Sequence, residues 1–224
     1  MLLIHDSTAR GRTQTGWLDA RHSFAFGSFA DPKRPGFARL RVLNEDHIAP
    51  GAGFPAHDHA DMDILTIVLS GAIAHEDNLG NRGITRAGEA QLMQAGAGIV
   101  HSERNPSETE PTHLLQIWLI PDRRGGVPGY AQAALPKGEA VLAGPGGLLP
   151  LGSDTRVTVL RPGEGAVTRL QATAPRKTFL HLVEGLAWLG QERLRGGDGV
   201  QLADEPAHDL HWHSDGFALL FDMP

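Results

Sequence analysis

The sequence predicts an all-β protein made of two antiparallel β-barrels in tandem. Its apolar residues occur in strand-sized runs or in alternation, and no stretch has the period of a long amphipathic helix. The 224 residues include 28 glycines and 15 prolines, which suit many short strands joined by tight turns better than a helical bundle. The second half of the chain repeats the hairpin spacing of the first, which predicts two similar units.

The first half supplies the strands of one barrel. A nearly unbroken apolar strand at 64–69 is followed by Ser70-Gly71, a second strand, and the turn Asp-Asn-Leu-Gly-Asn at 77–81, which together have the signature of a hairpin. Residues 37–43 alternate between apolar and polar, as a half-buried strand does. The strands predicted for this half are 37–43, 64–69, 72–75, 88–94 and 114–120.

A linker follows these strands. Residues 121–128 read Pro-Asp-Arg-Arg-Gly-Gly-Val-Pro, and 131–135 are expected to be loosely structured. We therefore divide the chain into an amino-terminal domain over 1–130 and a carboxy-terminal domain over 131–224. The strands predicted for the second half are 155–160, 166–170, 178–183, 186–189, 199–202 and 216–221.

Charge and cysteine content exclude several classes of protein. The formal net charge is −6 and no long run of basic residues occurs, so direct nucleic-acid binding is not expected. The chain has no cysteine, so a bound metal must sit on nitrogen and oxygen ligands. Neither a signal peptide nor a membrane-spanning run is recognisable, and we expect a cytoplasmic protein without membrane contact.

Residues 51–105 carry the candidate site. They contain His57-x-His59 and, about forty residues later, His101-x-Glu103. Side chains two residues apart on a strand point to the same face, so each pair can direct both donors inward. If the two strands face each other in a small barrel, three imidazoles and one carboxylate converge on a mononuclear divalent metal site.

The motifs around these pairs resemble those of a known family. Gly51-x5-His57-x-His59-x3-Asp63-x7-Gly71, followed by Gly96-x-Gly98-x2-His101-x3-Asn105, resembles the two signature motifs of the cupin superfamily. Longer segments are similar to pirin-like proteins, from about His22 through Trp118 and again in the last residues, ALLFDMP. These segments are HSFAFG at 22–27, NED at 44–46, DMDILTIVLSGAIAHEDNLGN at 61–81 and AGAGIVHSERNP at 95–106.

The resemblance implies a bicupin, in which two jelly-roll-like barrels pack face to face and only the amino-terminal one holds a metal. It implies His57, His59, His101 and Glu103 as the ligands. Several members have quercetin 2,3-dioxygenase activity, and the eukaryotic member is described as a nuclear co-regulator of transcription. The chain departs from the family pattern at Asp63, Ile67 and Gly96, where Glu, Tyr and Pro are usual, and the shorter Asp63 leaves open a hydrogen bond to a ligand histidine.

Three neutral imidazoles and one carboxylate suit Fe(II), Mn, Ni, Co, Cu or Zn, and we favour Fe(II). Two adjacent positions of an octahedral ion would remain open. A flavonol could bind there through its 3-oxygen, with Glu103 as general base, and the resemblance implies ring opening with O2. The expected partners are a small aromatic substrate and O2; a monomer is expected, and a protein partner is left open.

Two other functions compete with a dioxygenase. The first is a redox-sensitive regulatory protein whose metal changes the surface that a partner contacts, and the second is a seed-storage-like bicupin with an incidental metal. For the four residues themselves, the alternatives are a structural zinc site or histidines that are hydrogen-bonded in a polar cleft.

Other polar residues receive simpler interpretations. His211-Trp-His213 lacks a glycine-framed motif and is interpreted as a polar strand edge. His75 and His113 are interpreted as hydrogen-bonded barrel or surface histidines, and His22 as a residue of the cavity wall. Gln116 and Trp118 face one side, so one could reach the ligands. The candidates for hydrogen bonding to a ligand histidine are Asp61, Asp63 and Ser102.

Overall fold

The computed structural model describes all 224 residues, and it divides them into two compact units. The amino-terminal unit comprises Gly11–Leu135 with Leu151–Ser153, and the carboxy-terminal unit comprises Met1–Arg10, Pro136–Pro150 and Asp154–Pro224. Apart from one 3-10 turn at Ser7–Ala9, every regular element is a strand, and the predicted all-β class is confirmed. The structure contains no helix that is long and apolar enough to cross a membrane.

This division differs from the expected one, 1–130 and 131–224, at residues 1–10, 131–135 and 151–153. Strand β1 (Leu2–His5) pairs antiparallel with β18 (Gly199–Trp212), so the first ten residues belong to the carboxy-terminal unit. Residues 131–134, expected to be loosely structured, form part of β12 (Gly129–Ala134), which pairs with β9 of the amino-terminal unit. The first two differences come from pairing between strands that are distant in sequence.

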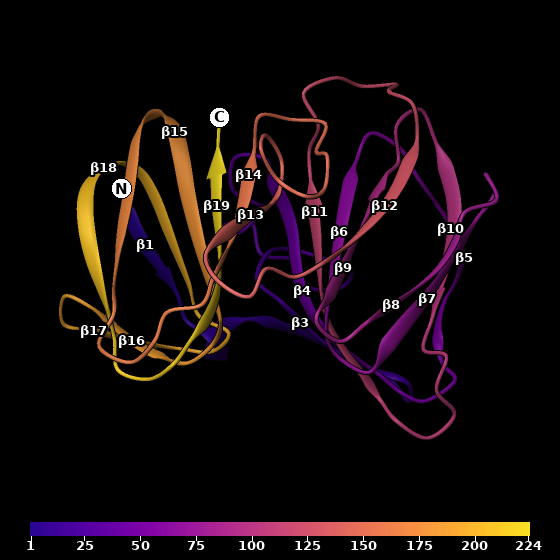
Figure 1. The fold of residues 1–224 in the computed structure, drawn as a ribbon, viewed down its shortest axis with the longest axis horizontal. Helices are drawn as coiled ribbons and strands as arrows, with labels where there is room; N and C mark the ends of the chain where they lie inside the picture. Colours follow the sequence, from indigo (N-terminus) through magenta and orange to yellow (C-terminus); the bar gives the residue numbers. More distant parts are fainter. The chain divides into compact units, whose positions relative to one another are not determined.

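The amino-terminal unit consists of two antiparallel sheets (Figure 1). The larger has seven strands in the order β12-β9-β6-β11-β4-β3-β2, and the smaller has four in the order β5-β10-β7-β8. Its strands are β2 (Gly11–Gln14), β3 (Leu18–His22), β4 (Leu40–Ile48), β5 (Gly53–His59), β6 (Asp63–Ser70), β7 (Ala72–Asp77), β8 (Arg82–Arg86), β9 (Glu89–Gln94), β10 (Ile99–Arg104), β11 (Thr112–Leu119) and β12 (Gly129–Ala134).

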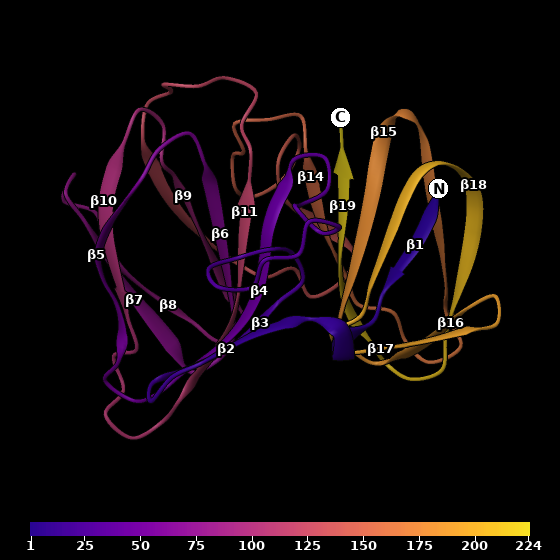
Figure 2. The same ribbon diagram turned by 180° about the vertical axis from the view of Figure 1, so that it is seen from behind.

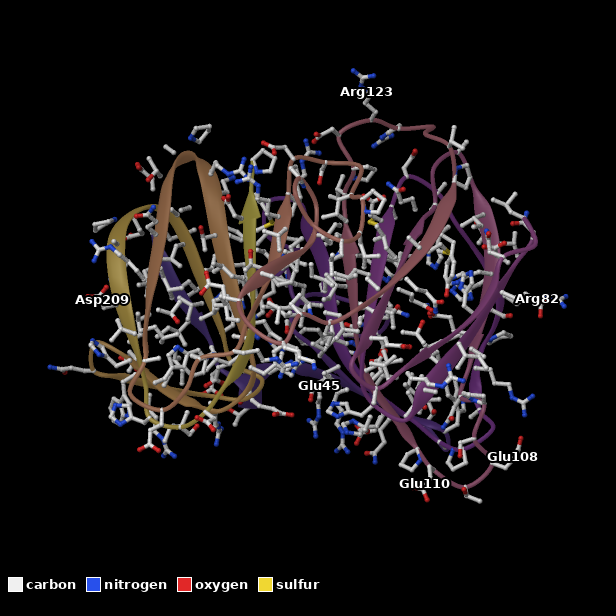
Figure 3. All side chains as sticks on the ribbon, viewed as in Figure 1. Glu45, Arg82, Glu108, Glu110, Arg123 and Asp209 are labelled. Carbon is white, nitrogen blue, oxygen red and sulfur yellow. The ribbon has the colours of Figure 1, made fainter.

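Apolar side chains from both sheets hold this unit together. One core cluster joins Ile48, Val68 and Leu114 of the larger sheet to Ile73 of the smaller one. A second cluster contains Ile64, Met93 and Ile99, and Trp118 packs against it. Burial of such side chains contributes roughly 1.5–3 kcal/mol each relative to exposure, so the sequence's apolar runs fix which strand faces are turned inward. Charged side chains such as Arg82, Glu108 and Arg123 project outward (Figure 3).

The turn between β6 and β7 depends on Gly71. Its φ is +74°, and a Cβ there would lie 2.7 Å from the backbone oxygen of Pro111. Glycine alone tolerates both conditions without strain, so Gly71 allows the chain to pass from β6 in the larger sheet to β7 in the smaller one, and the predicted hairpin is formed by β7 and β8.

The carboxy-terminal unit is one eight-stranded sheet in the order β13-β14-β19-β15-β18-β16-β17, with β1 added to β18 (Figure 2). Its core cluster includes Leu180, Leu202 and Trp212. The predicted strands 166–170 and 178–183 fall within one long strand, β15, which pairs with both β18 and β19. Its other strands are β13 (Ala140–Ala143), β14 (Arg156–Leu160), β15 (Val167–Glu184), β16 (Leu186–Leu189), β17 (Glu192–Arg195) and β19 (Phe217–Met223).

Candidate metal centre

The pairing of β5 with β10 brings the two sequence motifs together. The strands are antiparallel, with His101 opposite His57 and Ile99 opposite His59. The register shifts between His101 and Glu103, so that Glu103 lies opposite Phe54. Alternation within each strand places both donors of a motif on one face. The pairing of β5 with β10 then brings the donors of the two motifs side by side.

Three of the four predicted ligands form one cluster. The ligand atoms of His57, His59 and His101 all lie within 4.8 Å of one another. The ring centroids of His57 and His101 are 4.4 Å apart, and those of His59 and His101 are 5.1 Å apart. Glu103 is not in this cluster; it forms a second one with His75 and His101, again within 4.8 Å. His101 thus belongs to both clusters.

The donor atoms of the histidines fit a divalent transition metal. Nε2 of His101 is buried and has no hydrogen-bond partner, which costs about 1–3 kcal/mol unless a ligand satisfies it. Nδ1 of His57 lies 2.7 Å from the carbonyl oxygen of Pro55. That contact requires the hydrogen on Nδ1 and leaves Nε2 of His57 with a lone pair. A metal ion would bind through Nε2 of His57 and Nε2 of His101.

Burial keeps the imidazoles of His59 and His101 neutral. Desolvation, followed by the charges of His57, His59 and His75, lowers the pKa of His101 to about 3. Desolvation, followed by the charge of His57, lowers the pKa of His59 to about 4. Neutral imidazole is the form that binds a metal, so protons do not compete for these two nitrogens near neutral pH.

Glu103 lies between two amide side chains. It is 2% exposed, and its Oε1 and Oε2 accept hydrogen bonds from Nε2 of Gln91 at 2.8 Å and Nε2 of Gln116 at 2.7 Å. The amide oxygens of these residues accept from the Tyr130 hydroxyl at 3.0 Å and the Trp118 indole at 3.3 Å. Burial outweighs the amide donors and raises the pKa of Glu103 to about 7, which allows it to exchange a proton near neutral pH.

Gln116 therefore contacts Glu103, whereas the expected partners of the ligand histidines lie elsewhere. Asp63 accepts the backbone N–H of Gly152 at 2.6 Å, and Asp61 accepts that of Gly125 at 2.7 Å. Ser102 lies on β10 between His101 and Glu103 and so faces the opposite side of the strand. The groups at hydrogen-bond distance from ligand histidines are the Pro55 carbonyl, which faces His57, and His75, which faces His101.

His75 is a site residue whose importance the sequence interpretation missed. It is buried, as a barrel histidine would be, but its Nδ1 lies 3.3 Å from Nδ1 of His101 and its Nε2 lies 3.1 Å from Oδ2 of Asp77. The sequence contains one signal, since His75 and Asp77 are two residues apart, as the two donors of each motif are. The role of this pair becomes visible only from the pairing of β7 with β10, which places Asp77 opposite His101 and His75 opposite Glu103.

The remaining candidate histidines lie apart from both clusters. His113 contacts Glu45 at 3.0 Å. His211 and His213 are exposed on either side of the buried Trp212. None of these three histidines belongs to either cluster.

A hollow of about 200 Å³ lies in the amino-terminal unit beside the Glu103 network. Its wall includes Gln116, His22, Phe26 and Phe54. His22 is held by hydrogen-bond contacts of 2.8 Å to both Asn44 and Thr13. Ring contacts link Phe54 to His57, and they link Phe26 through Trp118 to His59. The hollow is therefore connected to the histidine cluster through the ring contacts of Phe54 and Phe26, and His22 lines it, as expected.

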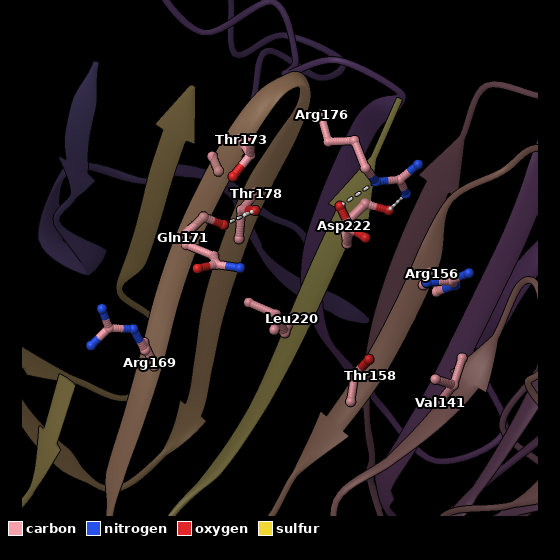
Figure 4. Close-up of a pocket in the computed structure, with 11 residues that line it drawn as sticks. Val141, Arg156, Thr158, Arg169, Gln171, Thr173, Arg176, Thr178, Leu220 and Asp222 are labelled. Carbon is pink, nitrogen blue, oxygen red and sulfur yellow. Dashed lines mark hydrogen bonds and ion pairs between the residues drawn. The ribbon is translucent and has the colours of Figure 1, made fainter. Parts of the chain in front are cut away.

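A larger hollow, of about 500 Å³, lies on the carboxy-terminal sheet (Figure 4). Three arginines line it, but Arg176 bonds Asp222 and Asp154 and Arg169 bonds Asp209. It contains no histidine or second carboxylate beside Asp222. We therefore place the candidate chemistry in the amino-terminal unit.

The chain is similar to known proteins over its whole length. Residues 5–119 match the Pirin family model, and residues 143–223 match a model described as the quercetinase C-terminal cupin domain. The chain is 39% identical to a protein named quercetin 2,3-dioxygenase from Escherichia coli K12, covering 100% of this chain and 99% of the relative. It is 38% identical to a pirin-like protein of Caulobacter vibrioides, with 95% of each chain covered.

Solved structures give the same result. Two crystal structures of YhhW from Escherichia coli, one described as a bacterial pirin in complex with nickel(II), superpose with a TM-score of 0.95 at 38% identity. The match covers 100% of this chain and 98% and 99% of those chains. Both units of the chain are thus cupin domains, and the chain belongs to the pirin family.

Proposed function

We propose that His57, His59, His101 and Glu103 hold one divalent metal ion and that the chain is a quercetin 2,3-dioxygenase-like enzyme. Its substrate would be a flavonol or similar enol-bearing aromatic, whose heterocycle is opened with O2. The observation that carries the proposal is the buried, unpartnered Nε2 of His101 within a cluster of three imidazoles. The names of the relatives and the nickel complex of one of them support it.

When bound, the ion would supply Lewis-acid stabilisation of the substrate's enolate oxygen. Glu103 is suited to receive the enol proton because its pKa of about 7 lies near the operating pH. The amides of Gln91 and Gln116 hold its two oxygens in place and stabilise its ionised form. The protein thus prepares a carboxylate that can take up one proton while its position is kept.

The hollow beside Gln116 is suited to hold part of an aromatic substrate. Phe26 and Phe54 provide apolar walls, and His22 and Asn44 provide polar groups. At about 200 Å³ it is smaller than the roughly 300–1,000 Å³ typical of pockets for drug-sized ligands. We expect it to enclose one end of a flavonol, with the enol end directed toward the histidines.

The ligand set does not select one metal. Fe(II) remains the ion we favour, and the nickel complex of a relative makes Ni(II) the first alternative. Mn, Co, Cu and Zn fit the same nitrogen and oxygen donors. Elemental analysis of protein expressed without added metal decides the identity, and zinc alone would count against oxygen chemistry because zinc has no redox role.

Oxygen uptake with quercetin tests the function. The purified protein is loaded in turn with Fe, Mn, Ni, Co and Cu and compared with His57→Ala and His211→Ala. His211 is the matched control, because it is an exposed histidine of the other His-x-His sequence. We expect metal-dependent uptake in the parent and in His211→Ala and its loss in His57→Ala. Stoichiometric metal binding without uptake for any ion would overturn the enzymatic proposal and leave a binding role.

A further inference from the structure

Asp77, His75 and His101 form a buried chain of contacts that leads to the candidate metal centre. Oδ2 of Asp77 lies 3.1 Å from Nε2 of His75, and Nδ1 of His75 lies 3.3 Å from Nδ1 of His101. Both histidines are 2% exposed and Asp77 is 8% exposed. The remaining nitrogen of His101, Nε2, is the one without a partner.

The direction of the hydrogen bonds from Asp77 through His75 to His101 is fixed at Asp77. Its Oδ1 accepts the backbone N–H groups of Leu79 and Asn81, each at 3.0 Å, and its Oδ2 accepts the amide of Asn81 at 2.9 Å. A carboxylate with these donors acts as an acceptor toward its fourth neighbour, His75. The hydrogen of His75 must therefore be on Nε2, and the Nδ1 of neutral His75 carries a lone pair.

The same reasoning extends one residue further. Because Nδ1 of His75 accepts, Nδ1 of His101 must donate, and the hydrogen that a neutral imidazole carries is then not on Nε2. The ring of Tyr130 stacks on His75 with centroids 4.4 Å apart and planes 15° apart, which keeps the His75 ring in the required orientation.

We propose that Asp77 and His75 are positioning residues that fix the tautomer of His101, with its hydrogen on Nδ1 and the Nε2 lone pair available to a metal. The use of that lone pair rests on the proposed function, whereas the tautomer itself does not. In the opposite tautomer an N–H would point at the place that a metal must occupy. Asp77 and His75 therefore keep Nε2 of His101 ready to bind a metal before any ion arrives.

A second role for His75 is possible on distance alone, because His75, His101 and Glu103 form the second cluster within 4.8 Å. In that arrangement Nδ1 of His75 would be a metal ligand itself. The two roles differ in a measurable way. A positioning residue keeps its Nδ1 as a hydrogen-bond acceptor when the metal binds, whereas a ligand acquires a coordination shift there.

The variant Asp77→Asn reverses the direction of the hydrogen bonds that link residue 77, His75 and His101. The backbone donors of Leu79 and Asn81 require an acceptor at the Oδ1 position, so the amide nitrogen takes the Oδ2 position and donates to Nε2 of His75. The Asn81 side-chain amide, which donates to Oδ2 in the parent, must then turn so that its oxygen accepts from the same nitrogen. His75 then carries its hydrogen on Nδ1, and His101 must carry its own on Nε2. Glu76→Gln is the matched control. It also replaces a carboxylate with an amide, at the preceding residue of β7, where the side chain is exposed and forms an ion pair with Arg82.

The experiment is nitrogen NMR of protein labelled with 15N histidine, recorded without metal, with His101→Gln used to assign the His101 signals. In the parent and in Glu76→Gln we expect the hydrogen of His101 on Nδ1; in Asp77→Asn we expect it on Nε2. Competition with a chelator should then give a Zn(II) affinity that is about 10–100-fold lower in Asp77→Asn and unchanged in Glu76→Gln.

Because Asp77 also holds the turn at Leu79 and Asn81, His75→Ala provides a second variant that leaves this turn intact. In it, Nδ1 of His101 loses its acceptor, and both tautomers of His101 should appear. The inference is overturned by an Nε2-hydrogen tautomer in the parent, by a single unchanged tautomer in His75→Ala, or by a zinc coordination shift at Nδ1 of His75. Failure of the parent to bind zinc, with the expected tautomer present, would instead count against the proposed function.

Discussion

Glu103 is the residue on which the chemistry of the site depends most. Its carboxylate is buried, yet two amides donate to it, so the surrounding side chains favour the charged form that burial disfavours. These two effects oppose each other and leave a pKa of about 7. A residue with this pKa can either bind a metal as a carboxylate or receive a proton.

Replacing Gln116 with leucine removes one donor from the Glu103 carboxylate. Hydrogen bonds to charged groups contribute about 1.5–3 kcal/mol, so we expect Gln116→Leu to lower the free energy of unfolding by an amount of that order at pH 8.5, where Glu103 is ionised. Denaturant unfolding measures it. The loss should be smaller in a Glu103→Gln background; equal losses in both backgrounds would show that Gln116 acts through packing alone.

Asp63 gives a pH dependence that is separate from the candidate ligands. Burial, only partly offset by the backbone N–H of Gly152 and by Gln94, raises the pKa of its carboxyl above 3.8 in the folded protein. The folded state then holds more protons than the unfolded state at and above pH 3.8, so this group's contribution to stability falls as pH rises through the folded pKa.

Asp63→Asn, which cannot titrate, isolates that contribution. The difference in unfolding free energy, parent minus variant, should decrease as the pH rises from 3.8 and become constant above the folded pKa of Asp63. Denaturant unfolding at a series of pH values measures it. A difference that increases with pH would mean that the hydrogen bond from Gly152 outweighs burial.

At the scale of elements, the site depends on how closely β5 and β10 approach. Gly53 begins β5, and a Cβ there would run into the backbone oxygen of Glu103 and lie 2.6 Å from Cα of Arg104. Since both obstacles are backbone atoms, a side chain at this position must push the strands apart. Histidines from one strand and Glu103 from the other would then separate.

We therefore expect Gly53→Ala to destabilise the amino-terminal unit by about 1–3 kcal/mol and to weaken metal binding. Gly126→Ala is the control, because a Cβ at Gly126 meets nothing within 4 Å. Denaturant unfolding and chelator competition measure the two effects. Unchanged metal affinity in Gly53→Ala would show that the strand spacing is not critical for the site.

At the scale of the whole chain, the first strand completes the unit formed by the last residues. β1 pairs with β18 from Leu2 opposite Leu202 to His5 opposite Gly199, and His5 contacts the side chain of Gln201 at 3.1 Å. The carboxy-terminal unit is thus closed by residues from the other end of the sequence.

Deletion of residues 1–5 should destabilise the carboxy-terminal unit and leave the candidate metal centre intact. We expect amide hydrogen exchange to accelerate in residues 199–202 and to remain unchanged in β5 and β10. Exchange mass spectrometry of the full and shortened chains measures this. Faster exchange in β5 and β10 would show that the stability of the metal centre depends on β1.

The sequence by itself determined the all-β class and the inward direction of the candidate ligands. Alternation along a strand is local, so His57 with His59 and His101 with Glu103 could each be assigned to one face from their spacing alone. The pirin resemblance, which the family comparison confirms, supplied the expectation that these faces meet.

The tertiary structure alone decided which strands became neighbours. It placed β7 beside β10, so that His75, interpreted as a barrel or surface histidine, and Asp77, assigned to a turn, became neighbours of His101. It also set Gln91 and Gln116 around Glu103. It also moved β1 into the carboxy-terminal unit. The physical reason is the same in each case: side-chain direction follows from the local backbone, whereas strand pairing depends on burial and hydrogen bonding between segments far apart in the chain.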